Sequence, residues 1–205
     1  MKKSPFSLRL TVLTVGVLML VLTGCGGTTA PARFYVLSPL VGAEKGVQAL
    51  RDESRISIGI GPVEVAQYLD RPQIVTRLSP NELKLADFDH WGEPLKDNFS
   101  RVLTENLLTL LSAEPIAVFP LRGPTKLDYR VEVEVMVLDG DLGGKAELVA
   151  RWAIFRDEDR QMLFTKKSSL SEAAGGGSYE AFVSAQSRAV EALSREIAKA
   201  IKDIL

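Results

Sequence analysis

The sequence contains one cysteine and one histidine among its 205 residues. A single cysteine excludes an intrachain disulfide and a cysteine-based metal cluster, and a single histidine excludes a metal site built on a histidine pair. The formal net charge is −1, so the chain also lacks the basic surplus that nucleic-acid binding requires. We therefore expect no metal site, no cofactor and no nucleic-acid partner.

The N-terminal segment has the pattern of a secretory signal. Basic residues Lys2, Lys3 and Arg9 precede an almost wholly apolar run over residues 10–22. A helix that spans a bilayer needs about 20 apolar residues, so this run is too short to span and matches the apolar core of a signal peptide. The rest of the chain is long enough for one domain, and a hydrophobic fraction of 46% allows it a buried core.

The signal ends at Leu22-Thr23-Gly24-Cys25, which resembles the lipobox of bacterial lipoproteins. That resemblance implies removal of residues 1–24, acylation of Cys25 and a flexible lipidated tether over residues 25–32, followed by the domain at 33–205. Two or more acyl chains anchor a protein stably in a membrane. Gly26 follows the cysteine where an aspartate would favour the inner membrane, so we expect the outer membrane. The alternative is an ordinary signal with an incidental cysteine.

The patterning after the tether predicts a single α/β domain. Apolar residues recur at spacings of three and four in two segments, which predicts long amphipathic helices over 95–111 and 179–205. Alternation of apolar and polar residues is clearest over Tyr129–Val137 and predicts a strand there, followed by two more in an antiparallel meander. We expect a mixed sheet with both helices packed on it. The predicted strands cover residues 33–37, 55–63, 73–77, 82–88, 116–119, 129–137, 146–154 and 161–168.

The sequence offers little support for catalysis. No Gly-x-Ser-x-Gly motif accompanies His90, which we expect to have a packing or capping role just before the first helix. Asp139 and Asp141 lie in a segment rich in turn-forming residues, and turn chemistry explains both carboxylates. We therefore predict that the protein is not an enzyme; a lipid-anchored hydrolase remains an alternative.

One segment has the composition of a binding surface. Residues 68–77 read Tyr-Leu-Asp-Arg-Pro-Gln-Ile-Val-Thr-Arg, and arginine and tyrosine are favoured at protein interfaces. The alternative is a structural turn with a contact from Asp70 to Arg71 or Arg77. The residues that we predict to form a partner interface are Tyr68, Leu69, Asp70, Arg71, Gln73 and Arg77.

The same segment resembles the central motif of the PqiC/YmbA family of ABC-type transport auxiliary lipoproteins. Three further stretches agree in order with that family: Phe34–Pro39, Ile58–Val63 and Trp91–Leu95. The resemblance covers nearly the whole chain after the tether. It implies a fold similar to the N-terminal domain of TolB and supplies no catalytic residues.

The resemblance also implies a function. Relatives work with periplasmic proteins that carry MCE (mammalian cell entry) domains and bridge the two membranes to carry lipids. We therefore expect an outer-membrane lipoprotein on the periplasmic face that docks such a bridge and supports envelope integrity. A homo-oligomer is a further partner that we consider. The alternative is a structural lipoprotein that assists another envelope assembly machine.

Overall fold

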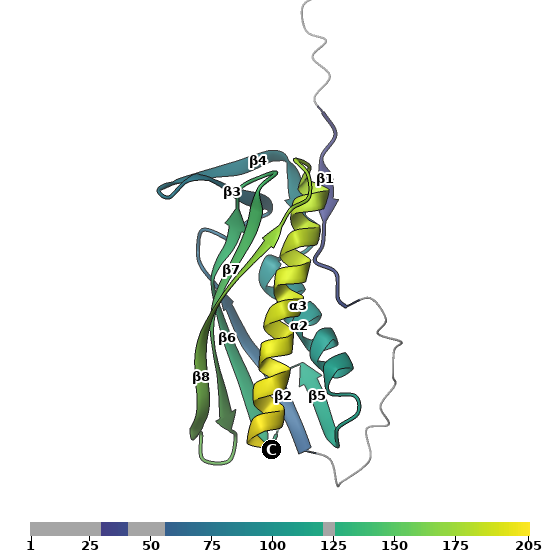
Figure 1. The fold of residues 1–205 in the computed structure, drawn as a ribbon, viewed down its shortest axis with the longest axis vertical. Helices are drawn as coiled ribbons and strands as arrows, with labels where there is room; N and C mark the ends of the chain where they lie inside the picture. The colour runs from purple at the N-terminus through teal and green to yellow at the C-terminus, as the bar shows by residue number, and fades with distance from the viewer. Residues whose placement is uncertain (1–29, 41–55, 121–125) are drawn as a thin grey trace, which may run out of the picture. The chain divides into compact units, whose positions relative to one another are not determined.

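The computed structural model describes residues 30–40, 56–120 and 126–205, and residues Ala32–Leu205 form one compact unit. Cys25 lies outside the described residues. Each predicted strand and both predicted helices are present (Figure 1). The elements are β1 Arg33–Tyr35, β2 Ile56–Val65, β3 Gln73–Ser79, β4 Glu82–Trp91, α2 Leu95–Leu110, β5 Ile116–Pro120, β6 Tyr129–Gly140, β7 Lys145–Arg156, β8 Met162–Ala173 and α3 Tyr179–Ile204.

The larger sheet has five strands in the order β5-β2-β6-β7-β8. β2 runs parallel to both of its neighbours, whereas β6, β7 and β8 form the expected antiparallel meander. Val131, Val133 and Val135 on β6 are buried, while the intervening Glu134 is exposed. Alternating burial of this kind places one face of the sheet on the core and the other in water.

One detail of β6 differs from the predicted alternation. Val137 was expected to continue the buried face, but it is only half-buried and Leu138 is buried in its place. The register with β7 shifts between Val135 and Val137. An extra residue at such a bulge moves the following side chains to the opposite face of the strand.

The remaining strands form a second sheet in the order β1-β4-β3. β3 and β4 make an antiparallel hairpin, and β1 pairs in parallel with the end of β4, where Arg33 lies opposite Asp89. The sequence predicted one mixed sheet, and the structure divides its strands between two. The predicted class, a single α/β domain with a meander and two packed helices, is confirmed.

Both helices pack on the five-stranded sheet (Figure 1). Ser178 caps α3, because its side chain accepts a hydrogen bond from the amide of Ala181. Phe182, Leu193 and Ile197 of α3 are fully buried, and burial of one such side chain contributes about 1.5–3 kcal/mol. On the exposed face of α3, Arg195 forms an ion pair with Glu191. Glu196 forms an ion pair with Lys166 on β8.

Candidate docking surface

The predicted interface segment links β2 to β3. Its turn is closed by backbone hydrogen bonds, with the amide of Leu69 donating to Ala66 at 2.8 Å and that of Arg71 donating to Leu69 at 2.8 Å. The amide of Trp91 donates to the carbonyl of Pro72 at 2.7 Å, which fixes the turn to the end of β4. The segment is therefore an integral part of the three-stranded sheet.

Two of the six predicted interface residues converge on one buried carboxylate. Arg77 binds Asp139 through Nε at 2.7 Å and Nη2 at 2.8 Å, and the hydroxyl of Tyr68 donates to Asp139 at 2.6 Å. The side chain of Asp139 is 0% exposed. Burial, and then the hydrogen bond to Asp139, raise the pKa of Tyr68, and the same carboxylate raises the pKa of Arg77. We call Tyr68, Arg77 and Asp139 the first carboxylate cluster.

This cluster corrects two expectations. Asp139 is the acidic centre that joins β3 to β6 and not a solvated turn residue. The partner of Arg77 is this Asp139 and not Asp70. The turn-forming sequence around Asp139 hid its burial, since the composition of a segment does not reveal which of its side chains points inward.

The other four predicted interface residues differ in exposure. Leu69 is buried in the core, whereas Asp70 is exposed and Arg71 and Gln73 are half-buried. The Nε atom of Arg71 is buried and has no hydrogen-bond partner within the described part of the chain. The turn therefore presents Asp70, Arg71 and Gln73 at the surface. The first carboxylate cluster connects the two ends of the segment to Asp139 on β6.

A second carboxylate cluster joins β1 to β4. Arg33 binds Asp89 through Nε at 2.8 Å, and the hydroxyl of Tyr35 donates to Asp89 at 2.8 Å. Asp89 is only 4% exposed. Sequence reasoning did not find this cluster, because its members lie more than 50 residues apart and only the pairing of β1 with β4 brings them together. His90 beside it has the expected packing role, with its ring 5.9 Å from that of Phe34.

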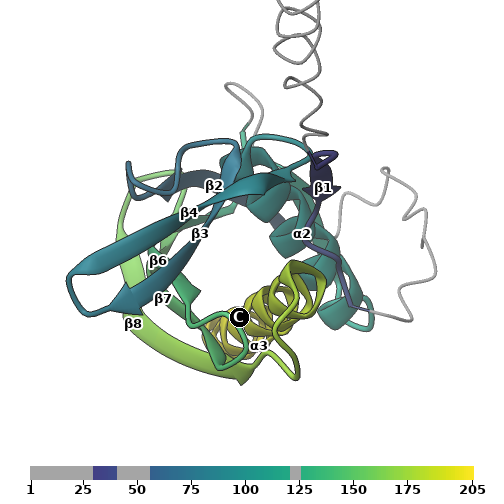
Figure 2. The ribbon, with the colours of Figure 1, turned by 90° about the horizontal axis from the view of Figure 1, so that it is seen from above.

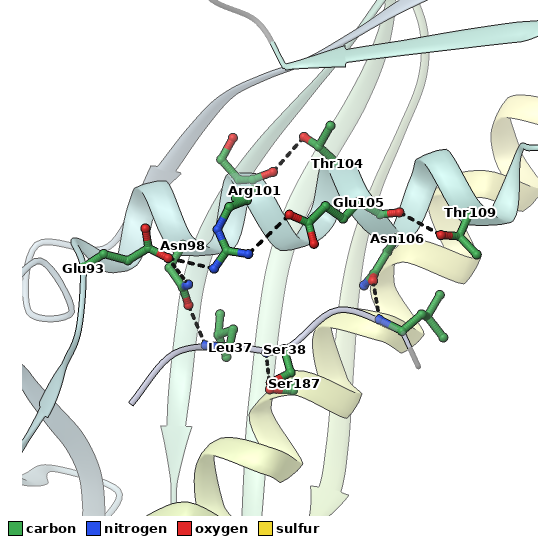
Figure 3. Close-up of polar contacts among 12 residues, drawn as sticks. Leu37, Ser38, Glu93, Asn98, Arg101, Thr104, Glu105, Asn106, Thr109 and Ser187 are labelled. Atoms are coloured by element: carbon green, nitrogen blue, oxygen red, sulfur yellow. Dashed lines mark hydrogen bonds and ion pairs between the residues drawn. The ribbon is translucent and has the colours of Figure 1, made fainter. Parts of the chain in front are cut away.

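The chain that leaves β1 is fastened between α2 and α3 (Figure 3). The amide of Leu37 donates to Oδ1 of Asn98 at 2.7 Å, and the amide of Leu40 donates to Oδ1 of Asn106 at 2.8 Å. Between them the amide of Ser38 donates to the hydroxyl of Ser187 on α3 at 3.1 Å. We call residues 37–40 the strap. The strap therefore connects the chain after β1 to both helices.

Asn98 is itself held by a charged neighbour. Its Nδ2 donates to Glu93, and Arg101 donates to the same carboxylate at 2.8 Å. The hydrogen bond from Arg101, and then that from Asn98, lower the pKa of Glu93. Each atom of the Asn98 amide therefore has a defined partner, which orients its oxygen toward the strap.

Exposed apolar side chains gather at the same sheet. Among the described residues eight large apolar side chains are exposed, and six of them belong to β1, the residue that follows it and the β3–β4 hairpin. We call these six the hairpin surface: Phe34, Val36, Leu78, Leu83, Leu85 and Phe88. Figures 1 and 2 show that the hairpin projects sideways at the end of the compact unit where β1 lies.

Few features of the described residues suggest chemistry. They hold no group of three or more side chains that could bind a metal ion, and neither described helix is long and apolar enough to cross a membrane. An open groove of about 430 Å³ lies between β8 and the C-terminal part of α3. Its floor includes the stacked rings of Trp152 and Phe164, and Lys166 and Glu196 on its rim are paired with each other.

Within the described residues the two buried carboxylates, Asp89 and Asp139, are ion-paired inside the fold, and six of the eight exposed large apolar side chains gather at one end. Residues 35–198 match the family model described as ABC-type transport auxiliary lipoprotein component. The chain belongs to this family, the PqiC/YmbA family. Membership implies association with an ABC transport system and indicates a membrane-anchored periplasmic lipoprotein.

Solved structures share the fold. The crystal structure of an uncharacterized protein is similar with a TM-score of 0.69 and 19% identity, over 84% of this chain and 99% of that one. A protein from Xanthomonas campestris, of the family DUF330, is similar with a TM-score of 0.64 and 18% identity, over 82% of this chain and 93% of that one. None of the curated proteins compared with the chain matches it.

Proposed function

We propose that this protein is an outer-membrane lipoprotein that serves an MCE/ABC-type intermembrane lipid transport system. Acyl chains on Cys25 hold it at the periplasmic face of the membrane, and the domain at 33–205 docks the periplasmic bridge that carries lipid. The observation that supports this most strongly is the family match over 35–198 in a chain that also has Leu22–Cys25 as a lipobox. Gly26 supports the outer membrane as the destination.

The docking interface that we propose is the turn between β2 and β3. Of the six residues predicted from the sequence, Asp70, Arg71 and Gln73 reach the surface and would contact the partner. Tyr68, Leu69 and Arg77 would act by holding the turn in place.

Capture of an MCE-domain protein from detergent-solubilised envelopes tests this proposal. The full chain should retain the MCE protein, and Arg71→Ala should weaken the complex about 30-fold if Arg71 is a hot spot worth about 2 kcal/mol. Arg195→Ala is the matched control, because Arg195 is an exposed arginine on α3. Sedimentation of the captured complex gives the number of copies of this chain and so tests the homo-oligomer.

Three results would contradict the proposal. Capture of another envelope machine in place of any MCE protein would favour the structural lipoprotein. An equal effect of Arg71→Ala and Arg195→Ala would remove the turn from the interface. Unfolding of the Arg71→Ala chain, measured by circular dichroism, would mean that Arg71 holds the turn rather than binds the partner.

A further inference from the structure

We propose that the hairpin surface lies in the lipid headgroup layer of the membrane that holds the anchor. This inference rests on the proposed acylation of Cys25. It adds a second, apolar contact with the membrane to the covalent one and assigns a role to Phe34, Val36, Leu78, Leu83, Leu85 and Phe88, which stay exposed in the folded chain.

The short tether places this surface near the bilayer. Arg33 at the start of β1 comes eight positions after Cys25 in the sequence, and eight extended residues span at most about 28 Å. A flexible segment of that length has a typical end-to-end distance of about 16 Å. Phe34, which at 68% is the most exposed large apolar residue in the described ranges, directly follows Arg33. The tether thus gives this surface a high effective concentration at the membrane, so a weak contact suffices.

The hairpin cannot swing freely away from the tether. β1 is paired with β4, and the second carboxylate cluster links Arg33 to the buried Asp89. The first carboxylate cluster fixes β3 to the five-stranded sheet through Arg77 and Asp139. The point where the tether enters the fold and the apolar side chains of the hairpin therefore form one rigid piece.

The hairpin exposes apolar side chains on both of its strands. Leu83 lies opposite Arg77 and Leu85 lies opposite Val75 in the register, so these two leucines share one face of β4. Leu78 follows Arg77 at a register shift in β3 and is 61% exposed. Exposed leucines therefore lie on both strands close to the turn of the hairpin.

The chemistry of the surface favours lipid over a protein groove. Its members are leucine, phenylalanine and valine; leucine and valine are under-represented at protein hot spots, whereas leucine and phenylalanine are typical of interfacial membrane contacts. Residues 78–88 carry two acids, Glu82 and Asp87, against one base, Lys84. With Arg33 and Arg77 both ion-paired, the surface has no basic cluster. Zwitterionic lipid is therefore the expected ligand.

Single-cysteine labelling of the acylated full chain tests the inference. Because acylation consumes the thiol of the only native cysteine, Phe34→Cys, Leu78→Cys and Leu83→Cys each offer one site for an environment-sensitive fluorophore. Met162→Cys is the matched control, since Met162 is 54% exposed and is the first residue of β8. The turn between β7 and β8 lies at the end of the compact unit away from β1 (Figure 1). The proteins are reconstituted into vesicles of phosphatidylethanolamine and phosphatidylcholine, with or without phosphatidylglycerol.

At positions 34, 78 and 83 we expect a blue shift of the emission and quenching by lipid-borne quenchers, with neither at position 162. Phosphatidylglycerol and salt should leave both signals unchanged. Equal signals at all four positions would overturn the inference. So would a blue shift that arises only when an MCE-domain protein is added, which would assign the surface to a protein partner.

Failure of the anchor gives a different result from failure of the membrane contact. A chain without acylated Cys25 does not float with the vesicles, and its mass shows a second fluorophore on the free thiol. A second outcome is a chain that floats and bears one fluorophore but shows no blue shift at positions 34, 78 and 83. This outcome would refute the membrane contact and leave the proposed function intact. Circular dichroism of each variant verifies folding, which these exposed positions should not disturb.

Discussion

Removal of Arg77 should destabilise the protein far more than removal of a surface arginine. Arg77→Ala deletes both guanidinium bonds to Asp139, at 2.7 and 2.8 Å, and leaves a carboxylate that is 0% exposed with the hydroxyl of Tyr68 as its main donor. Breaking a buried ion pair by removal of one partner costs about 3–5 kcal/mol. Arg77 itself is 28% exposed, so we expect the lower end, about 3 kcal/mol, out of a total stability of about 5–15 kcal/mol.

The assay is urea unfolding of the full chain in a non-ionic detergent, followed by tryptophan fluorescence. Trp91 on β4 reports on the three-stranded sheet and Trp152 on β7 reports on the larger one, and both are buried. Both signals should shift to lower urea in Arg77→Ala. Arg195→Ala removes only an exposed helical pair and should cost about 0.3–0.5 kcal/mol.

A second substitution tests the reason for the effect. Asp139→Asn in the Arg77→Ala background removes the uncompensated charge and keeps the shape of the side chain. Because a buried charge without a partner is costly, this second substitution should restore at least about 1 kcal/mol of the lost stability. The reasoning is refuted if Arg77→Ala costs no more than Arg195→Ala, or if the double variant is less stable than Arg77→Ala alone.

Three further predictions concern the polar contacts that hold the sheet and the strap. Asn98→Ala should cost about 1–3 kcal/mol because it leaves the buried amide of Leu37 without its acceptor, and hydrogen exchange at that amide should accelerate. Tyr68 has a raised pKa, so the stability that its protonated hydroxyl contributes is complete below the ordinary tyrosine pKa near 10 and falls as the pH rises above that value. The stability of Tyr68→Phe, measured by unfolding at alkaline pH, should lack this pH-dependent loss. Glu93 has a lowered pKa, so its contribution is present above about 4.5 and is lost as the pH falls; Glu93→Gln should flatten the acid limb of the stability curve, and an unchanged limb would contradict this assignment.

Local patterns were sufficient to predict the elements but not their partners. Alternation over Tyr129–Val137 identified β6 because one face of that strand packs on helices and the other faces water. The bulge after Val135 was not predictable, since its cause is the register with β7 and not the composition of β6. The division into two sheets was not predictable for the same reason, because β1 pairs with β4, which lies more than 50 residues away in the sequence.

The candidate interface shows the same limit. Tyrosine and arginine in residues 68–77 led to the prediction of a partner interface, but the residue type is the same whether the partner is another protein or a distant part of the same chain. Tyr68 and Arg77 bind Asp139, 62 or more residues away. Asp139 had no distinctive signal, because an acidic residue followed by glycine is typical of an exposed turn.

Mass spectrometry of the protein purified from membranes tests most directly whether the chain works as an acylated docking protein. We predict an N-terminal peptide that begins at Cys25, with a diacylglyceryl group on the sulfur and an acyl chain on the new amino group. A peptide that begins at an unmodified Cys25, or at any other residue, would contradict the account.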